Sequence, residues 1–501
     1  MPIPPLASGP QGPGALRPLL DTVLDALGVG AEARGGPLPA GGPEAVAARM
    51  RDTLGDPLPA EGDPQALHRL VHALTAGSAD PADPLCAAHL HTPPLAVATA
   101  ADLAASVLNP SLDSWDQAPA ASALEALVTE ALAKEVHPTA TPAKNTPAAP
   151  APAADAPART TPEGTALVTT GGTESNQLAV LLARETHPGV QLICGDNAHH
   201  SLPRAAWLLG LPEPLTVPAP AGTLDPAALD HALSRLNGRT ALVAATAGTT
   251  DAGLIDPLPD IADLCESHGA RLHIDAAYGG GLLFSDRRRA LLTGLDRAHT
   301  VALDLHKLGW QPVAAGLLAV RDSTDLAALA LPHSRLRSSG GTPMADYLNA
   351  EDDTEAGFPD LLGRSLRTTR RPDILKIAVT LKTLGRTGLG ALVDQVCDLA
   401  QEFAALVDTH PGFELHDRPT ISTVLFRPTG ASDDTVAAVR RKLLHDGRAV
   451  IGRAALDGRL WFKTTLLNPH SRPGDLTALL KLIEVAQSAD LPEGTEGITP
   501  T

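Results

Sequence analysis

The sequence predicts an α/β fold in which a mostly parallel, seven-stranded sheet lies between layers of helices. Seven short runs rich in β-branched and other apolar residues occur between residues 165 and 321, and helix-length segments separate all of them but the last two. Strands that alternate with helices in this way form a parallel sheet that is covered on both faces. The runs are TALVTT, QLICG, PLTVPA, ALVAAT, ARLHIDA, TVALDLH and GLLAVR.

The segments before this region are predicted to be helical up to residue 136. Apolar residues recur at helical spacing from Leu16 to Leu27. Further helical patterns cover 43–54, 64–75, 97–108 and 119–135. Residues 137–164 contain too many prolines for a regular element, so we expect a linker or a surface insertion there.

From residue 165 onward the chain divides into three predicted parts. Residues 165–370 are expected to form one large domain around the seven strands, and residues 371–487 a small α+β domain, followed by a disordered tail at 488–501. In the small domain a long helical stretch precedes three strands and two helices. The strands are predicted at 422–428, 449–453 and 459–467, and the helices at 433–446 and 473–487.

Composition excludes several classes of function. The net charge of −18, without a dense Lys/Arg block, argues against a nucleic-acid partner. An acidic surface suits a cationic small molecule, although it also serves plain solubility. The four cysteines are too far apart for a metal site or a disulfide framework, so no metal is expected. No apolar run reaches about 18 residues and no secretory leader is evident, which predicts a cytoplasmic protein without a membrane span.

A first candidate site segment is TTGGTESN (169–176), which follows a strand and opens a helix. Gly171 and Gly172 let the backbone approach a ligand closely, and the helix start at Thr173 offers free N–H groups. This pattern favours a phosphate group, although a simple helix cap would look the same. The spacing of a dinucleotide or nucleotide loop is missing.

Two further strand ends carry charged side chains. Asp275 ends an apolar strand, where a carboxylate is costly to bury without a cationic partner such as a protonated pyridine nitrogen. Lys307 follows the next strand, where an amine can condense with an aldehyde cofactor. A capping Asp and a solvated Lys are the alternatives. His199, after another strand, has a flat ring that can stack on a cofactor or serve a structural role.

These segments occur in chain order, and together they resemble a known family. The stretch from about 84 to 485 resembles the group II decarboxylases that use pyridoxal 5′-phosphate (PLP), in particular L-2,4-diaminobutyrate decarboxylases and siderophore-pathway lysine decarboxylases. The resembling landmarks are AAHLHTPPL, LNPSLDSWDQAPAASALE, TTGGTESNQ, AHHS, ATAGTTDAGLIDPL, HIDAAYGGG, DLHK, ADYLN, TTRR, STVLFRP and WFKTTLLNP.

The resemblance implies a fold type I PLP enzyme that works as a homodimer with shared active sites. Lys307 would hold PLP as a Schiff base, Asp275 would pair with the ring nitrogen and His199 would stack over the ring. Phosphate or other cofactor contacts would come from Gly172, Thr173, Thr250 and His306, and the substrate side from His91, Trp115 and Asp116.

The sequence departs from the family at the loop that supplies a Tyr proton donor in aromatic amino-acid decarboxylases. The corresponding stretch at 351–365 has no Tyr, and Leu361 aligns near that position. His199 or another group would then reprotonate Cα, and an oxidative, aldehyde-forming path stays open. Pro372 replaces an aromatic residue, and 333–344 resembles an insertion.

The function expected from the resemblance is decarboxylation of an L-amino acid, with L-2,4-diaminobutyrate as the preferred substrate and 1,3-diaminopropane as the product. Lysine, ornithine and aromatic amino acids remain alternatives, as do a PLP-dependent aminotransferase and a non-catalytic module that binds a phosphorylated ligand.

Overall fold

The computed structural model describes residues 4–138, 164–329, 351–359 and 361–488. By contact, the chain divides into two compact units, Met1–Pro93 with Gln395–Thr501 (unit 1) and Pro94–Asp394 (unit 2). Each unit is described below by itself. The predicted insertion at 333–344, and nearly all of the predicted linker and C-terminal tail, lie outside the described residues.

Unit 2 contains the seven-stranded sheet that the sequence predicts. Its strand order is β1-β7-β6-β5-β4-β2-β3. Strands β2 to β6 pair in parallel, whereas β7 is antiparallel to both of its neighbours. The bounds are β1 Thr165–Thr169, β2 Gln191–Gly195, β3 Leu215–Val217, β4 Ala241–Thr246, β5 Arg271–Ala276, β6 Thr300–Asp304 and β7 Gly316–Val320. All seven predicted runs are therefore confirmed as strands of a mostly parallel sheet.

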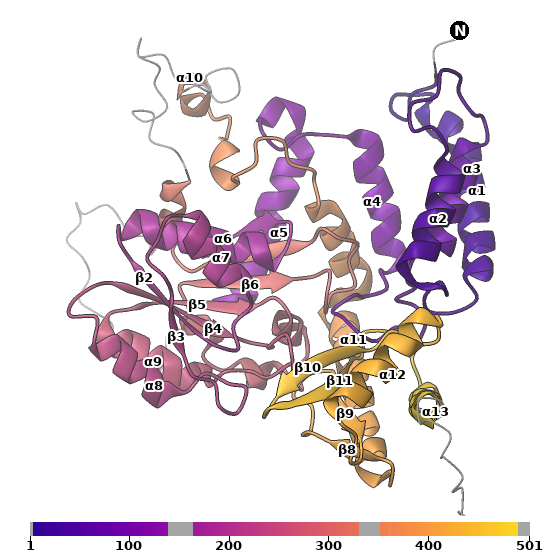
Figure 1. Cartoon of the computed structure of the whole chain (residues 1–501). Coiled ribbons are helices and arrows are strands. Elements are labelled where there is room, and N and C mark those ends of the chain that lie inside the picture. The colour runs from indigo at the N-terminus through magenta and orange to yellow at the C-terminus, as the bar shows by residue number, and fades with distance from the viewer. Residues whose placement is uncertain (1–3, 139–163, 330–350, 360, 489–501) are drawn as a thin grey trace, which may run out of the picture. The chain divides into compact units, whose positions relative to one another are not determined.

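Helices cover both faces of this sheet (Figure 1). Helices α6 (Gly172–Thr186) and α7 (Ser201–Leu208) pack on one face, where Val180 and Leu202 share a core with Leu192 of β2. Helices α8 (Pro226–Ser234) and α9 (Leu258–His268) lie on the opposite face. Because residues alternate sides along a strand, both faces must be apolar, which accounts for strands such as ALVAAT that are buried along their whole length.

The remaining helices of unit 2 come from the segments that flank the sheet. Before it come α4, η1 and α5, and after it α10, η6 and the start of α11. Their bounds are α4 Ala96–Leu108, η1 Trp115–Gln117, α5 Pro119–Val136, α10 Glu351–Glu355, η6 Leu362–Arg364 and α11 Ile374–Thr409. Short 3-10 helices η2 Gly279–Phe284, η3 Arg289–Leu292, η4 Leu295–Arg297 and η5 Ser323–Ala328 lie in the connections.

Because β7 runs antiparallel to β6, these two strands, the last of the seven predicted, form a hairpin. Asp304 of β6 pairs with Gly316 of β7, and the Leu305 N–H donates to the Ala315 carbonyl over 2.8 Å. The chain therefore leaves β6 and returns at the same edge of the sheet, without a crossover helix. This explains why no helix-length segment separates the last two apolar runs.

Unit 1 has its own core around a four-stranded antiparallel sheet of order β10-β11-β9-β8. Phe403, Phe426 and Phe462 are buried at the centre of this core. The strands are β8 Phe413–Leu415, β9 Thr423–Pro428, β10 Gly452–Leu456 and β11 Arg459–Thr465. The helices are α1 Gly12–Arg34, α2 Gly42–Leu54, α3 Ala66–Ala76, α12 Asp433–His445 and α13 Pro473–Ser488.

One strand in this region was missed and one prediction was wrong. The short strand β8 was not predicted, because three residues give too little alternation to recognise. The strand predicted at 449–453 begins instead at Gly452, because Val450 pairs with another part of the chain: its N–H and C=O bond the backbone of Leu85 and Ala87. The predicted domain boundaries at 136, 164, 370 and 487 stay a prediction.

Within the described ranges, no helix is both long enough and apolar enough to cross a bilayer.

Candidate active site

The candidate site lies at the carboxyl edge of the parallel strands in unit 2, where ligands of open α/β sheets bind. Asp275 lies near the end of β5, and Asp304 ends the neighbouring strand β6. Helix α6 begins with Gly172, directly after β1. The fold therefore brings to one edge the segments that the sequence marked separately.

Asp275 is a buried carboxylate that is held by two donors. Its side chain is 5% exposed, and Oδ2 accepts a hydrogen bond of 2.7 Å from Asn176 Nδ2, while the Ala277 N–H donates to Oδ1 over 3.1 Å. A carboxylate has about four lone-pair positions, so these two bonds leave room for a further donor. This capacity fits the N–H of a protonated pyridine ring.

Asn176 extends this contact into a network of buried polar side chains. Its Nδ2 also donates to Ser201 Oγ over 2.8 Å, and its Oδ1 lies 2.9 Å from His273 Nε2. His273 Nδ1 lies 2.9 Å from Thr300 Oγ1. Burial lowers the pKa of His273 to about 4, so this imidazole is neutral and its Nε2 carries the proton that Asn176 accepts.

His199 is joined to Asp275 through the same network. Its Nδ1 lies 2.8 Å from Ser201 Oγ, which in turn accepts from Asn176. The hydroxyl therefore donates to Nδ1, and the proton of the neutral ring is on Nε2. Burial is the main cause that lowers the pKa of His199. The neighbouring His200 lies beside this ring, because the chain turns into α7 here and the two ring centroids are 4.1 Å apart.

Lys307 forms an ion pair with the carboxylate that ends β6. Its Nζ lies 2.9 Å from Asp304 Oδ2, and His306 Nε2 lies 3.5 Å from the same oxygen. The Ala315 N–H donates to His306 Nδ1 over 3.3 Å, which places the proton of the neutral ring on Nε2. Burial lowers the pKa of His306, which favours this neutral form.

The glycine turn before α6 is shaped for close approach of the backbone. Gly171 has φ 149°, a conformation that is essentially restricted to glycine. A Cβ on Gly172 would lie 2.8 Å from the Ala277 Cβ, and one on Gly316 would lie 2.5 Å from the backbone of Gly171. The Gly171 N–H donates to Thr169 Oγ1 over 3.3 Å, and the turn leads into Gly172 at the positive end of the helix, where a phosphate group is favoured.

The described residues fit PLP at this edge of the sheet. A phosphate matches the Gly171–Gly172 turn, and a pyridine N–H matches Asp275. Lys307 supplies an amine for the aldehyde. Among the described side chains, Asp304 Oδ1 is buried without a hydrogen-bond partner, so a polar contact at this place is still to be supplied.

The remaining predicted site residues are Thr173, Thr250, Trp115, Asp116 and His91. Thr173, in the first turn of α6, and Thr250, after β4, are both exposed. Trp115 and Asp116 belong to η1 of unit 2 and are exposed, whereas His91 belongs to unit 1. The binding roles of all five stay predictions.

Leu361, which aligns near the missing Tyr, is buried among apolar side chains. It is 6% exposed and packs with Leu112, Ala118 and Ala121, which flank η1. Nearby in the sequence, Phe358 contacts Trp115 with ring centroids 5.2 Å apart. The segment that lacks the phenol therefore packs against the predicted substrate-side segment.

Sequence reasoning did not identify Asn176, Ser201, His273 or Asp304 as parts of the site. All four stand inside segments that the sequence marked, which are TTGGTESN, AHHS, HIDAAYGGG and DLHK, but only the fold shows what their side chains contact. A second acidic strand end beside Asp275 was the one available signal for Asp304.

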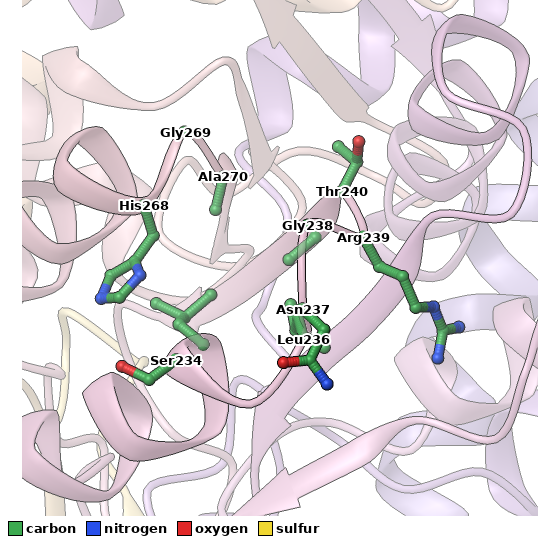
Figure 2. A pocket seen from close by; sticks show the side chains of 11 residues that line it. Ser234, Leu236, Asn237, Gly238, Arg239, Thr240, His268, Gly269 and Ala270 are labelled. Atoms are coloured by element: carbon green, nitrogen blue, oxygen red, sulfur yellow. The ribbon is translucent and has the colours of Figure 1, made fainter.

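A separate pocket of about 260 Å³ lies near the amino-terminal ends of β4 and β5, lined by residues 233–234, 236–241 and 268–270 (Figure 2). The side chains of Arg239 and His268 extend away from each other in Figure 2, and each is bonded elsewhere: Arg239 to Gln191 and His268 to Asp230. No set of polar groups converges on this pocket.

Comparison with known proteins identifies the family of this chain. The family model described as "Pyridoxal-dependent decarboxylase conserved domain" matches residues 56–429. An L-2,4-diaminobutyrate decarboxylase of Rhizobium meliloti (strain 1021) is 38% identical over 430 residues, which are 83% of this chain and 79% of the relative. One from Acinetobacter baumannii is 31% identical over 446 residues, 81% of each chain.

Solved structures agree in fold. The glutamate decarboxylase domain of diaminobutyrate-pyruvate transaminase and L-2,4-diaminobutyrate decarboxylase from Vibrio parahaemolyticus superposes with a TM-score of 0.80 at 28% identity, covering 97% of this chain and 98% of that one. Oryza sativa TDC with PLP and tryptamine gives 0.81 at 22% identity, covering 97% and 100%, a likeness of fold alone. The chain therefore belongs to the pyridoxal-dependent decarboxylase family and is a PLP-dependent amino-acid decarboxylase.

Proposed function

We propose that this enzyme removes the α-carboxylate of L-2,4-diaminobutyrate, releasing CO2 and 1,3-diaminopropane, with Lys307 as the residue that binds PLP covalently. The site assignment is supported by one observation above all. Asp275 and Lys307 come from the ends of adjacent parallel strands, next to a glycine turn that suits a phosphate group. The substrate assignment is supported by the two L-2,4-diaminobutyrate decarboxylases at 38% and 31% identity.

When bound, the cofactor supplies an electron sink for the pair of electrons that the departing carboxylate leaves behind. Asp275 keeps a proton on the ring nitrogen, which makes that sink effective. The network through Asn176 stabilises the charged form of Asp275 by donating to its carboxylate. His199 lies over the ring in this proposal, with a neutral imidazole oriented by Ser201.

Phosphate binding is assigned to the backbone at Gly172, the Thr173 hydroxyl and the Nε2–H of His306. Thr250 is a further cofactor contact in this proposal. A proton must return to Cα after CO2 leaves, and the Nε2–H of His199 is our candidate, because no phenol stands at the aligned position of Leu361.

The distal ammonium of the substrate needs an acceptor, and Asp116 is the proposed one. It is exposed, and its Oδ1 accepts from Ser114 Oγ over 2.6 Å, which leaves Oδ2 available for a cation. Trp115 and His91 complete the substrate side in a homodimer that shares its active sites. A cytoplasmic location stays a prediction from the sequence.

The decisive experiment uses the purified holoenzyme. Borohydride should trap the cofactor on the protein, and peptide mapping should place it on Lys307. Diaminobutyrate, lysine, ornithine, glutamate and aromatic amino acids are then compared by kcat/KM, with CO2, amine, aldehyde and peroxide measured together. We expect diaminobutyrate to be preferred, with one amine per CO2. A preference for another amino acid would reject the substrate, and aldehyde with peroxide would indicate the oxidative path.

A further inference from the structure

Asp304 is a buried acidic residue beside Lys307, and the proposed function assigns it no role. Its carboxylate is 2% exposed. Oδ2 lies 2.9 Å from Lys307 Nζ and 3.5 Å from His306 Nε2, whereas Oδ1 accepts no hydrogen bond from any described residue. Burying a carboxylate with one oxygen unpaired costs about 1–3 kcal/mol, which indicates that the oxygen gains a partner in another state.

The unpaired oxygen lies beside the proposed phosphate site. A Cβ built on Gly172 would be 3.3 Å from Asp304 Oδ2, and one built on Gly171 would be 3.7 Å from Oδ1. A group seated on the backbone of these glycines therefore comes within reach of Asp304. An ionised carboxylate would repel a phosphate there, whereas a protonated one donates a hydrogen bond to it.

Lys307 loses its positive charge when it is used. An ammonium nitrogen has no lone pair, so Lys307 must release a proton before it can bond an aldehyde carbon. Asp304 Oδ2, 2.9 Å from Nζ, is in position to accept that proton. His306 is another titratable neighbour, but its Nδ1 accepts from the Ala315 N–H and its Nε2 bears the proton, so it has no free acceptor position.

We propose that Asp304 exchanges partners when the cofactor binds: it pairs with the Lys307 ammonium beforehand, takes the proton from Nζ, and then donates that proton to the phosphate. The balance closes. Nζ passes one proton to Oδ2 and uses its lone pair to bond the aldehyde carbon, and its two remaining hydrogens leave with the carbonyl oxygen as water. Asp304 is thus a positioning residue that couples formation of the covalent link to phosphate binding. This inference depends on the proposed role of Lys307.

The test compares two forms of the cofactor on two variants. Cofactor-free enzyme is prepared from the holoenzyme, and the dissociation constants of PLP and of pyridoxal, which lacks the phosphate, are measured by fluorescence titration. Asp304→Asn retains a donor for the phosphate, whereas Asp304→Ala retains none. Asp325→Asn is the matched control, because it also breaks a carboxylate ion pair, with Arg271 at the start of β5, away from the site.

We expect Asp304→Ala to weaken PLP binding about tenfold, the value of one hydrogen bond to a charged group. Pyridoxal binding should be unchanged or stronger in the same variant, because Lys307 is then no longer held as an ammonium. Asp304→Asn should bind PLP within about threefold of the wild type, and Asp325→Asn should change neither constant.

Three results would overturn the proposal. Equal weakening of PLP and pyridoxal in Asp304→Ala would mean a merely structural role, and so would a loss of PLP in Asp304→Asn as large as in Asp304→Ala. Unchanged PLP binding in Asp304→Ala would mean no phosphate contact. Borohydride trapping of Lys307→Ala in parallel separates this from failure of the proposed function: a cofactor still trapped there would reject Lys307 itself, whatever Asp304 does.

Discussion

Single residues in this site work as pairs and chains of buried polar groups. Asp275 is hydrogen-bonded to Asn176, and the hydrogen-bond network continues from Asn176 through Ser201 to His199. Each member is a donor or an acceptor with a fixed direction, so a change at one residue is passed to the next. Two predictions concern the two ends of this hydrogen-bond network, at Asp275 and at His199.

At the first end, Asp275→Ala should weaken PLP binding by about 10- to 100-fold, because a hydrogen bond to a charged group contributes about 1.5–3 kcal/mol. Turnover should also fall, because the ring nitrogen loses the group that keeps it protonated. Equilibrium dialysis and single-turnover CO2 release measure the two effects. Tight binding with normal turnover would contradict the role of Asp275.

At the other end, Ser201→Ala removes the hydroxyl that donates to His199 Nδ1. The backbone N–H of residue 201 still reaches Nδ1 over 3.3 Å, so the ring should stay in place but be less firmly held. We expect kcat to fall about fivefold, with KM little changed, for the loss of roughly 1 kcal/mol of orientation. A Ser201→Thr variant should restore activity, and an unchanged kcat in Ser201→Ala would argue against this chain.

The sequence was informative about residues at strand ends and uninformative about their partners. Asp275 and Lys307 were predicted because a charge beside an apolar strand is conspicuous. The partners of Asp275 were not, because Asn176 is 99 positions away along the chain and its contact depends on how β1, β5 and α6 come together. The roles assigned to Lys307, Asp275 and His199 stay predictions until they are tested.

At the scale of elements, the glycine turn before α6 fixes how closely that helix approaches β5. Gly172→Ala would put a Cβ 2.8 Å from the Ala277 Cβ, closer than carbon atoms pack. We expect weaker PLP binding and a loss of about 1–3 kcal/mol in the free energy of unfolding, as for other overpacked sites. Urea denaturation with a PLP titration checks both.

Gly28→Ala is the matched control for this prediction. Gly28 lies inside α1, and a Cβ added to it would have no other atom within 4 Å. Alanine there should leave PLP binding unchanged and raise the free energy of unfolding by about 0.5–1 kcal/mol. Equal effects of the two substitutions would show that the Gly172 contact has no special importance.

His299, in the connection before β6, makes the free energy of unfolding depend on pH. Burial lowers the pKa of His299 from 6.5 to about 4, and the Leu272 N–H donates to its Nδ1, which a proton would block. Between those two values the unfolded chain binds a proton that the folded chain does not, so stability falls as pH decreases from 6.5 towards 4.

We therefore expect a lower urea midpoint at about pH 5 than at about pH 7.5. His299→Gln should reduce this decline without abolishing it, because burial also lowers the pKa of His273 to about 4. A decline equally steep in the variant and the wild type would exclude His299 as a cause.

A helix or strand was predictable where its hydrophobic pattern and its length both indicated the same kind of element. All seven strands of the large sheet were recognised from apolar runs. The reversed direction of β7 was not, because a run such as GLLAV has no polarity along the chain. The strand at 449–453 was displaced because Val450 pairs with the segment around Cys86, a contact between distant parts of the chain.

The whole molecule is proposed to be a homodimer in which each active site draws on both chains. The particle should then have about twice the 51.5 kDa mass of the chain in sedimentation. Lys307→Ala and His91→Ala are expected to be inactive separately. If the two residues come from different chains in each site, mixed dimers regain one intact site, and an equal mixture should recover about one quarter of wild-type turnover.

This experiment also has a clear negative result. No recovery in proven mixed dimers would mean that Lys307 and His91 act within one chain. A monomeric, active enzyme would reject the shared site altogether.

The hairpin of β6 and β7 has a consequence for how this enzyme can acquire new specificity. Lys307 lies in a connection that is hydrogen-bonded at both ends, through Asp304 with Gly316 and Leu305 with Ala315. Its backbone therefore cannot be displaced without breaking the ladder on either side. In directed evolution for another amino acid, we expect adaptive substitutions to accumulate around 112–117 and 351–364, while residues 304–316 tolerate almost none.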